Sequence, residues 1–303
     1  MGTTTGATPA GPTPTGAAPW RAAVYMLVAS ALFSTMNALA KFLLVADDGP
    51  EMGALQITFA RYAFGTLFLL PALYAARVMP RTAHPLKYAF RASAGVAGVA
   101  LMFFAIAVIP LANATAIGFS SPLFAMIFAV LLLGEKANRF RWLAAVVGFA
   151  GVVVIAAPDL SAFGSASLLA VAAAVCMGGE IAAIKWLSRL GDRAITMLFF
   201  GNLFGALIAS LLAVPTWVWP APGQWLILAA TGLVAVVGQR LLLHAMAMAD
   251  ANFIAPFLYS SLLFSALYGV LFFDEVLRLS LFFGMIMIVG SGLLLLRFGQ
   301  QRN

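Results

Sequence analysis

The sequence predicts an all-α integral membrane protein whose ten transmembrane helices form two inverted five-helix repeats. Of its 303 residues, 63% are hydrophobic and only 9% are charged, whereas soluble domains have roughly 45–50% apolar and about 25% charged residues. The apolar residues occur in runs close to the roughly 20 residues that a helix needs to cross a bilayer. The two halves of the chain also align with each other, as described below.

Short polar breaks separate ten apolar runs, and each run predicts one span. The runs are 22–45, 54–76, 86–107, 112–133, 140–157, 165–186, 195–214, 224–245, 252–273 and 280–297. The residues left over are too few for a sizeable soluble domain, which excludes most soluble catalytic folds.

The spans divide into two predicted repeats, residues 20–158 and residues 159–298. Residues 1–19 are rich in Thr, Pro, Gly and Ala and cannot form an apolar core, so we expect a disordered tail. They also lack the basic start of a secretory signal. Residues 299–303 form a short C-terminal tail.

The basic residues predict the orientation, because Lys and Arg near span ends accumulate on the cytoplasmic side. With the N-terminus inside, thirteen of the seventeen Lys and Arg residues lie in cytoplasmic segments, and the outer loops contain only Arg278. Both termini are therefore expected in the cytoplasm of a bacterial cell, with the protein in the inner membrane. The net charge of +7 reflects this topology, and no nucleic-acid partner is expected.

The repeat is visible without gaps at an offset of 140 residues. Segment 105–135 reads AIAVIPLANATAIGFSSPLFAMIFAVLLLGE, and segment 245–275 reads AMAMADANFIAPFLYSSLLFSALYGVLFFDE. Because five spans is an odd number, the second copy enters the membrane upside down, and Glu135 and Glu275 fall on opposite sides. Inverted repeats of this kind are typical of transporters that work by alternating access, with the substrate near the midplane.

These residues resemble the drug/metabolite transporter superfamily, specifically its ten-span EamA branch. The first copy has Ala112, Ala116, Pro122 and Gly134-Glu135, and the second has Ala251, Ala255-Pro256 and Asp274-Glu275, where Asp replaces the Gly. Asn37 and Lys41 in span one and Arg61 in span two also fit. The resemblance covers about residues 20–298 and implies a transporter of small metabolites such as amino acids, opine-type metallophores or riboflavin.

Ionisable side chains inside spans are costly, so each is a candidate functional residue. Glu180 in span six and Arg240 in span eight are predicted to face a central cavity, where they either pair or contact a zwitterionic substrate; a permanent salt bridge between the spans is the alternative. Arg240 suits a carboxylate, because its planar fork donates two parallel hydrogen bonds. His244 lies four residues later on the same helix face.

The expected roles of Arg61 and Lys41 follow from how far each lies from the outer end of its span. Arg61 lies about 10 Å below the outer end of span two, which is compatible with an outer vestibule or with a structural pair to a helix-end carbonyl. Lys41 is close enough to the outer end of span one to extend to the headgroups.

A second set of candidates is polar and uncharged. Residues of this kind hydrogen-bond a substrate or join helices; in the predicted substrate site they are Asn37, Asn113, Ser120, Tyr259 and Ser260. The glycine pairs Gly95/Gly98, Gly148/Gly151 and Gly201/Gly205 are predicted to be close-packing sites.

No cofactor or metal site is predicted. Cys176 is the single cysteine and lies within a span, and the two histidines, His84 and His244, are far apart in the sequence. The G-x-x-x-x-G-K-[ST] loop that binds ATP phosphates is absent, so a proton or the membrane potential is the expected energy source, with facilitated diffusion as the alternative.

The leading hypothesis is a secondary transporter that exports an amino acid or an amino-acid-derived metabolite. Uptake of riboflavin or a similar cofactor is the alternative that the same architecture allows. An intramembrane enzyme would have to use Glu180, Arg240 and His244, and no nucleophile–base motif supports it; a passive channel disagrees with the inverted repeat. The expected partners are a small-molecule substrate and the lipid bilayer, with a proton as a candidate coupling ion, for a monomer or a homodimer.

Overall fold

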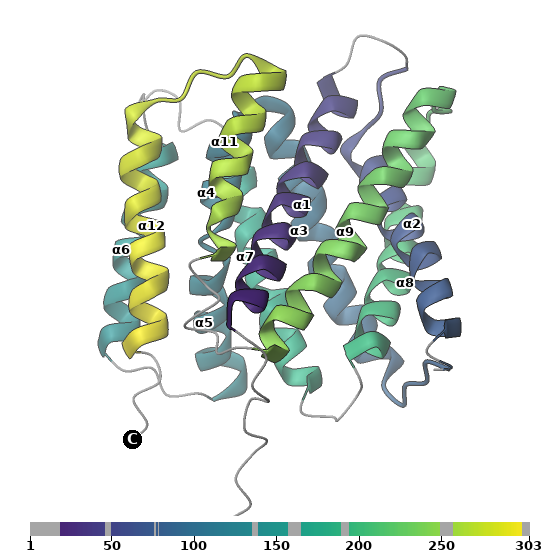
Figure 1. Ribbon diagram of the computed structural model, residues 1–303, viewed down its shortest axis with the longest axis horizontal. Helices are drawn as coiled ribbons and strands as arrows, with labels where there is room; N and C mark the ends of the chain where they lie inside the picture. Colours follow the sequence, from purple (N-terminus) through teal and green to yellow (C-terminus); the bar gives the residue numbers. More distant parts are fainter. Residues whose placement is uncertain are drawn as a thin grey trace, which may run out of the picture.

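The computed structural model describes residues 19–45, 50–75, 77, 79–134, 139–156, 165–188, 194–248 and 257–298. The helices in chain order are α1 Pro19–Val45, α2 Ala54–Ala75, α3 Pro85–Val108, α4 Leu111–Gly118, α5 Ser121–Leu133, α6 Arg139–Ala156, α7 Ser165–Ser188, α8 Ala194–Ala213, α9 Pro222–Met248, α11 Ser260–Phe273 and α12 Leu279–Phe298. They run side by side as one bundle (Figure 1). A 3-10 turn, Val214–Thr216, follows α8.

The described helices confirm an all-α membrane protein. Among the described residues, seven segments are long and apolar enough to span a bilayer, with α4 and α5 counted together as one, and three shorter apolar helices accompany them. The fourth predicted span is divided into α4 and α5 by a turn at Phe119 and Ser120. In the ninth, only Phe257 to Phe273 is described, and residues 252–256 lie outside the described part.

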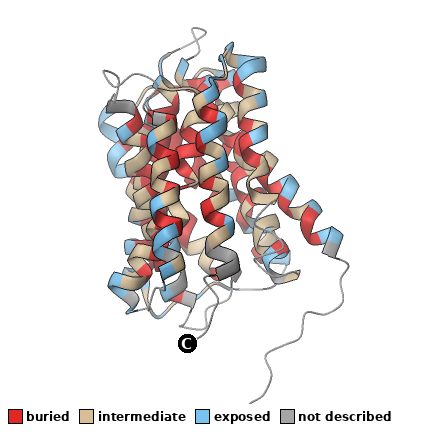
Figure 2. Ribbon diagram, turned by 90° about the vertical axis from the view of Figure 1, so that its left-hand side faces the viewer, coloured by how far each residue is buried: buried red, intermediate tan, exposed pale blue. Residues whose placement is uncertain are grey.

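Buried residues lie toward the centre of the bundle and exposed ones toward its periphery (Figure 2). Ile57, Phe103 and Leu228 are fully buried, whereas Leu211 and Leu226 are 76% and 75% exposed. Large apolar side chains on an outer surface are stable when lipid covers them, because lipid tails are as apolar as leucine. The periphery is thus suited to a bilayer.

Helix pairing follows the two repeats. α1 packs on α9, and α3 packs on α7. These contacts are equivalent, because α1 of the first repeat corresponds to α7 of the second, and α3 corresponds to α9. α2 packs on α8, and α6 packs on α12, each joining equivalent spans of the two halves. In Figure 1, α6 and α12 form one side of the bundle, and α2 and α8 form the other.

Matching hydrogen bonds recur at the offset of 140 residues. The Ser120 hydroxyl donates to the Ile117 carbonyl at 2.7 Å, and the Ser260 hydroxyl donates to the Phe257 carbonyl at 2.6 Å. Gly134 and Asp274 both end their helices in the left-handed conformation, with φ values of 66° and 49°. Aspartate is one of the few residues besides glycine that adopts it readily, which explains why Asp replaces Gly in the second copy.

The predicted glycine pairs are confirmed as sites of close contact. A Cβ atom built on Gly148 or Gly151 would collide with Leu123 or with the Gly284 carbonyl, so α6 packs tightly against its neighbours. A Cβ atom on Gly284 of α12 would lie 2.7 Å from the Gly151 carbonyl oxygen. The α6–α12 pair therefore depends on residues without side chains, as membrane helix interfaces often do.

Replacing Gly284 by alanine is expected to lower the free energy of unfolding by about 1–3 kcal/mol, because an extra methyl group in a packed interface forces the backbones apart. The matched control is Gly290→Ala on the same helix, where the new Cβ atom would meet nothing within 4 Å. Thermal unfolding of both purified variants in detergent measures the difference. Equal melting temperatures would contradict this packing.

Candidate functional site

A cavity of about 320 Å³ lies among helices of both repeats. Its lining comes from α1, α2, α3, α4 and α5 of the first half, and from α7 and residues at the start of α11 in the second half. Among the described lining residues, Arg61 and Glu180 are charged, and the neutral polar ones are Ser34, Asn37, Thr115, Ser121 and Ser261. The rest of the wall is apolar and includes Phe33 and Phe119.

Arg61 is 6% exposed, and its Nε and Nη1 atoms have no hydrogen-bond partner among the described residues. The guanidinium carbon lies 4.2 Å from the centre of the Tyr62 ring. Ring contact stabilises a cation by about 0.5–2 kcal/mol, but it does not accept the in-plane N–H groups of the guanidinium. The cavity wall therefore contains a buried guanidinium with two nitrogens that lack a hydrogen-bond partner among the described residues.

Glu180 pairs with Arg91 of α3, which corrects the predicted pairing with Arg240. Arg91 Nη2 donates to Glu180 Oε1 at 3.3 Å, and Arg91 Nη1 donates to the Met197 carbonyl at 2.8 Å. Both groups need space: a Cβ atom on Gly95 would lie 3.0 Å from the Glu180 carboxylate, and one on Gly201 would lie 2.6 Å from Arg91 Nη1. Two of the predicted packing glycines thus make room for an ion pair.

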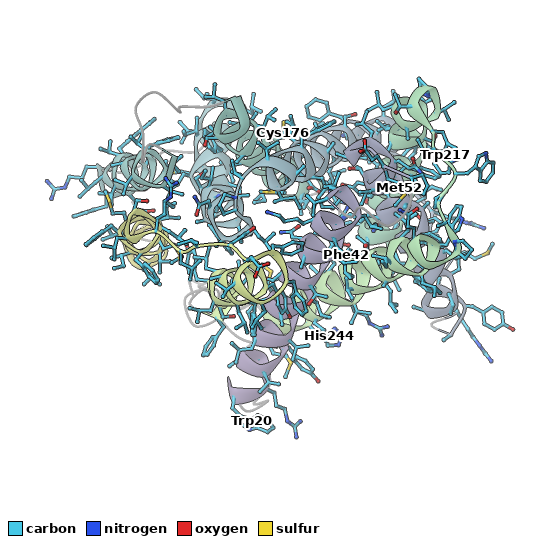
Figure 3. The ribbon with its side chains drawn as sticks, turned by 90° about the horizontal axis from the view of Figure 1, so that it is seen from above. Trp20, Phe42, Met52, Cys176, Trp217 and His244 are labelled. Carbon is cyan, nitrogen blue, oxygen red and sulfur yellow. The ribbon has the colours of Figure 1, made fainter. Side chains whose placement is uncertain are left out.

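Arg240 and His244 lie on the exposed face of α9, away from the cavity lining. Their spacing of four residues correctly predicts a shared helix face, but that face is directed outward. The His244 ring contacts the Tyr25 ring edge-on, with 6.2 Å between centroids, and Figure 3 shows His244 at the rim of the bundle. The structure therefore does not bring these two residues to Glu180.

The remaining predicted residues are placed separately. Asn37 lines the cavity, whereas Asn113 of α4 is half-buried and is not among the lining residues. Ser120 and Ser260 bond to backbone carbonyls within their own turns. The Tyr259 ring packs on Phe119 with 5.1 Å between centroids, and its hydroxyl lies close to Gly292. Of this group, only Asn37 lines the central cavity.

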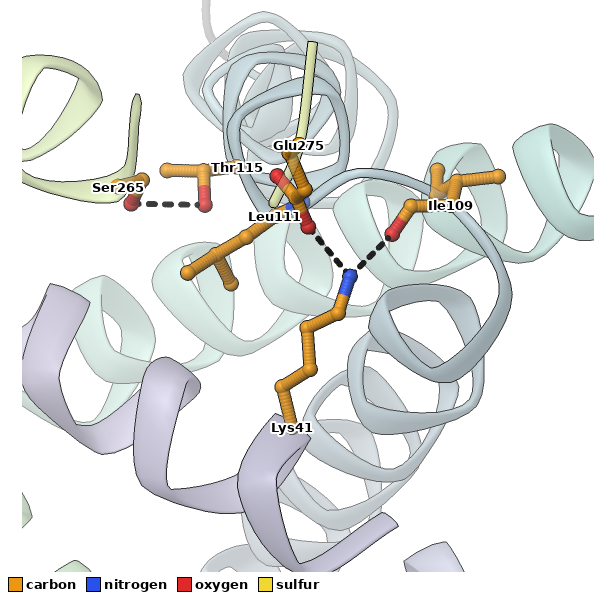
Figure 4. Close-up of polar contacts among 6 residues, drawn as sticks. All are labelled: Lys41, Ile109, Leu111, Thr115, Ser265 and Glu275. Atoms are coloured by element: carbon orange, nitrogen blue, oxygen red, sulfur yellow. Dashed lines mark hydrogen bonds and ion pairs between the residues drawn. The ribbon is translucent and has the colours of Figure 1, made fainter. Parts of the chain in front are cut away.

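A buried ion pair joins the two halves at the end of the bundle where α1 ends (Figure 4). Lys41 Nζ lies 2.5 Å from Glu275 Oε1 and donates a further bond to the Ile109 carbonyl at 3.1 Å. Both carboxylate oxygens of Glu275 accept the Leu111 N–H at 2.8 Å, at the start of α4. We call Lys41, Ile109, Leu111 and Glu275 the latch. Lys41 is therefore tied inward, which corrects its predicted extension to the headgroups.

A chain of hydroxyl groups links α1, α4 and α11. Ser34 donates to the Ser261 carbonyl at 2.8 Å, Ser265 donates to Ser34 at 3.1 Å, and Thr115 donates to Ser265 at 3.1 Å. Ser34 and Lys41 are seven residues apart on α1 and so lie on one helix face. The same face of α1 thus contacts the second half twice, through the Ser34 hydroxyl and through Lys41 of the latch.

Sequence reasoning missed the Lys41–Glu275 and Arg91–Glu180 ion pairs, which the structure forms within its described residues. Arg91 is one of the thirteen basic residues counted as cytoplasmic, although it lies inside the third predicted span. Glu275 follows the ninth predicted span, where an exposed outer loop is expected, but its side chain is only 6% exposed. Depth within a span was the available signal for Arg91; for Glu275 no pattern in the sequence indicated burial.

A larger pocket, of about 470 Å³, lies between α1, α9 and α11 and is almost entirely apolar. Its two lining hydroxyls, Thr35 and Tyr268, lie 3.1 Å apart and bond to each other. None of its described lining residues is charged, so it fits an acyl chain better than a polar metabolite. Within the described residues, no group of three His, Cys, Asp or Glu side chains could hold a metal ion.

Replacing Lys41 by methionine is expected to lower the free energy of unfolding by about 3–5 kcal/mol, because the buried carboxylate of Glu275 loses its counter-charge. The double variant Lys41→Met/Glu275→Gln should recover much of that loss, since it buries no unpaired charge. A double-mutant cycle by thermal unfolding in detergent measures the coupling.

The matched control for the latch is Arg278→Gln, an exposed basic residue of the same α11–α12 connection. Removing an exposed charge changes stability little, within about 0.5 kcal/mol. If the effects of Lys41→Met and Glu275→Gln simply add, the latch does not contribute as a pair.

Comparison with known proteins identifies the family. The sequence profile of the EamA-like transporter family matches residues 20–157 and again residues 164–297. A riboflavin transporter of Vibrio cholerae is 32% identical, over 89% of this chain and 90% of its own. A pseudopaline exporter of Pseudomonas aeruginosa is 31% identical, over 82% and 86%. An S-adenosylmethionine uptake transporter of Rickettsia bellii is 28% identical, over 82% and 85%.

The fold also matches a solved crystal structure. That chain is 22% identical, with a TM-score of 0.63, and the match covers 92% of this chain and 99% of the other. At that identity the likeness supports the fold alone. The two matches of one family profile coincide with the two halves that share the cavity and the latch. The chain is a multi-pass membrane protein that belongs to the EamA-like transporter family, within the drug/metabolite transporter superfamily.

Proposed function

We propose that this transporter resides in the bacterial inner membrane and exports an amino acid or an amino-acid-derived metabolite. The observation that carries the proposal is the central cavity, which is lined by both halves and contains a buried guanidinium, Arg61, without an acceptor at two of its nitrogens. Carboxylates are the natural acceptors for arginine in a site of this size, and they are common to all amino acids.

The latch supports alternating access. It ties α1 and the start of α4 to the α11–α12 connection, so it joins the two halves on one side of the cavity. With the N-terminus in the cytoplasm, this side faces the periplasm, and the present conformation is closed toward it. Opening toward the periplasm then requires the Lys41–Glu275 pair to separate while the two halves rock about the central site.

Uptake of riboflavin or a similar cofactor is the second candidate. The relative from Vibrio cholerae bears the name riboflavin transporter, and the cavity presents Phe33, Phe119 and Met177, which suit a flat aromatic ring. Riboflavin has no carboxylate to satisfy Arg61, so the export of an amino-acid-type substrate accounts for more of the lining.

Counterflow in proteoliposomes tests the function. Purified protein is expected to exchange labelled amino acids or opine-type conjugates saturably with an internal pool. Asn37→Phe should reduce this exchange about tenfold or more, because the larger ring occupies part of the cavity. Loss of about 1.4 kcal/mol of binding free energy lowers the affinity tenfold. Arg240→Gln is the control, since Arg240 lies outside the cavity lining.

The outcomes separate the two candidates. Exchange of riboflavin alone would replace the leading function with the second one. A flux that rises linearly with concentration, without counterflow, would indicate an open pore and contradict alternating access.

A further inference from the structure

We infer that the transported substrate carries a net negative charge and that Arg61 binds its anionic group. This inference rests on the proposed export function and specifies its substrate class. It starts from the charges that the cavity contains, since a substrate enters an apolar bundle at least cost when it neutralises a charge already buried there.

Arg61 contributes an uncompensated positive charge. It is buried at 6% exposure, lines the cavity, and has no hydrogen-bond partner at Nε and Nη1 among the described residues. A guanidinium stays charged in proteins, so, beyond the contact with the Tyr62 ring, an anion or water in the cavity lowers its cost of burial. An anion replaces water most favourably, because hydrogen bonds between charged groups are about twice as strong as neutral ones.

Glu180, the other charged lining residue, is already neutralised. Its carboxylate accepts a hydrogen bond from Arg91 at 3.3 Å, and Arg91 is held in place by the Met197 carbonyl at 2.8 Å. The absence of a side chain at Gly201 leaves the space that the Arg91 guanidinium occupies. Arg61, Glu180 and Arg91, the partner of Glu180 behind the lining, together carry a net charge of one positive unit, and the other polar lining residues are uncharged.

The charge on the substrate determines how the membrane potential acts on transport. In a complete transport cycle the empty protein returns to its starting conformation, so its own charges make no net movement. Without a coupled ion, only the charge of the substrate crosses the membrane. A potential of 100 mV, negative inside, then supports about a fiftyfold outward concentration ratio for a monovalent anion. Export of an anion can therefore proceed without a coupled proton, whereas uptake would work against the potential.

Two matched probe pairs test the inference. L-glutamate and an opine-type dicarboxylate, N-(1-carboxyethyl)alanine, each carry one net negative charge; L-glutamine and L-alanine are their neutral counterparts. Proteoliposomes with wild-type protein are loaded with one probe, and valinomycin with opposed potassium gradients sets the potential. Efflux of the anions is expected to be faster with the inside negative than with the inside positive, and efflux of the neutral probes to be independent of sign.

Arg61 variants test the site itself. Arg61→Gln should weaken counterflow of the anions about tenfold to a hundredfold, as expected for the loss of a hydrogen bond to a charged group. Arg61→Lys should retain part of it, and Arg240→Gln should retain all of it. The voltage measurement uses the unaltered protein and decides the inference even if Arg61→Gln does not fold.

The outcomes distinguish the inference from the function on which it rests. Saturable exchange of the neutral probes only, or efflux of the anions that is independent of voltage, overturns the inference and leaves the transporter function intact. If the wild type exchanges none of the probes, the proposed export fails. Thermal unfolding in detergent then decides the inference. It is overturned if neither anion raises the melting temperature of the wild type by more than it raises that of Arg61→Gln.

Discussion

The cost of burying charge governs this structure. A charged side chain inside an apolar bundle is stable only when another group neutralises it, and in this chain the partners come from opposite halves. Lys41 meets Glu275, and Arg91 meets Glu180. Each pair joins a helix of the first repeat to a segment of the second, so the requirement for neutralisation also fixes how the halves contact one another. Arg61 is the cavity residue that this pairing leaves over.

The two pairs differ in environment and therefore in consequence. Lys41 and Glu275 are 9% and 6% exposed and are bonded additionally to the backbone at Ile109 and Leu111. Glu180 is 26% exposed and borders the cavity. The first pair thus connects the two halves, whereas the second lies at the wall of the cavity and contributes to its charge. Small residues, Gly95 and Gly201, make the second pair possible.

Relatives with one architecture have names that refer to chemically different substrates: riboflavin, S-adenosylmethionine and pseudopaline. The shared features of the fold therefore say little about the cargo. In this chain, the lining of the central cavity combines an unpaired guanidinium, one neutralised carboxylate and aromatic side chains.

The sequence by itself determined the membrane class, the positions of the spans, the repeat and the packing glycines, because hydropathy, residue spacing and self-similarity are local properties of the chain. It also showed that Arg240 and His244 share a helix face. Only the tertiary structure decided that this face is directed outward and that Glu180 meets Arg91. Helical periodicity relates residues within one helix, but it contains no information on how that helix is rotated against its neighbours, and that rotation decides which charges come together.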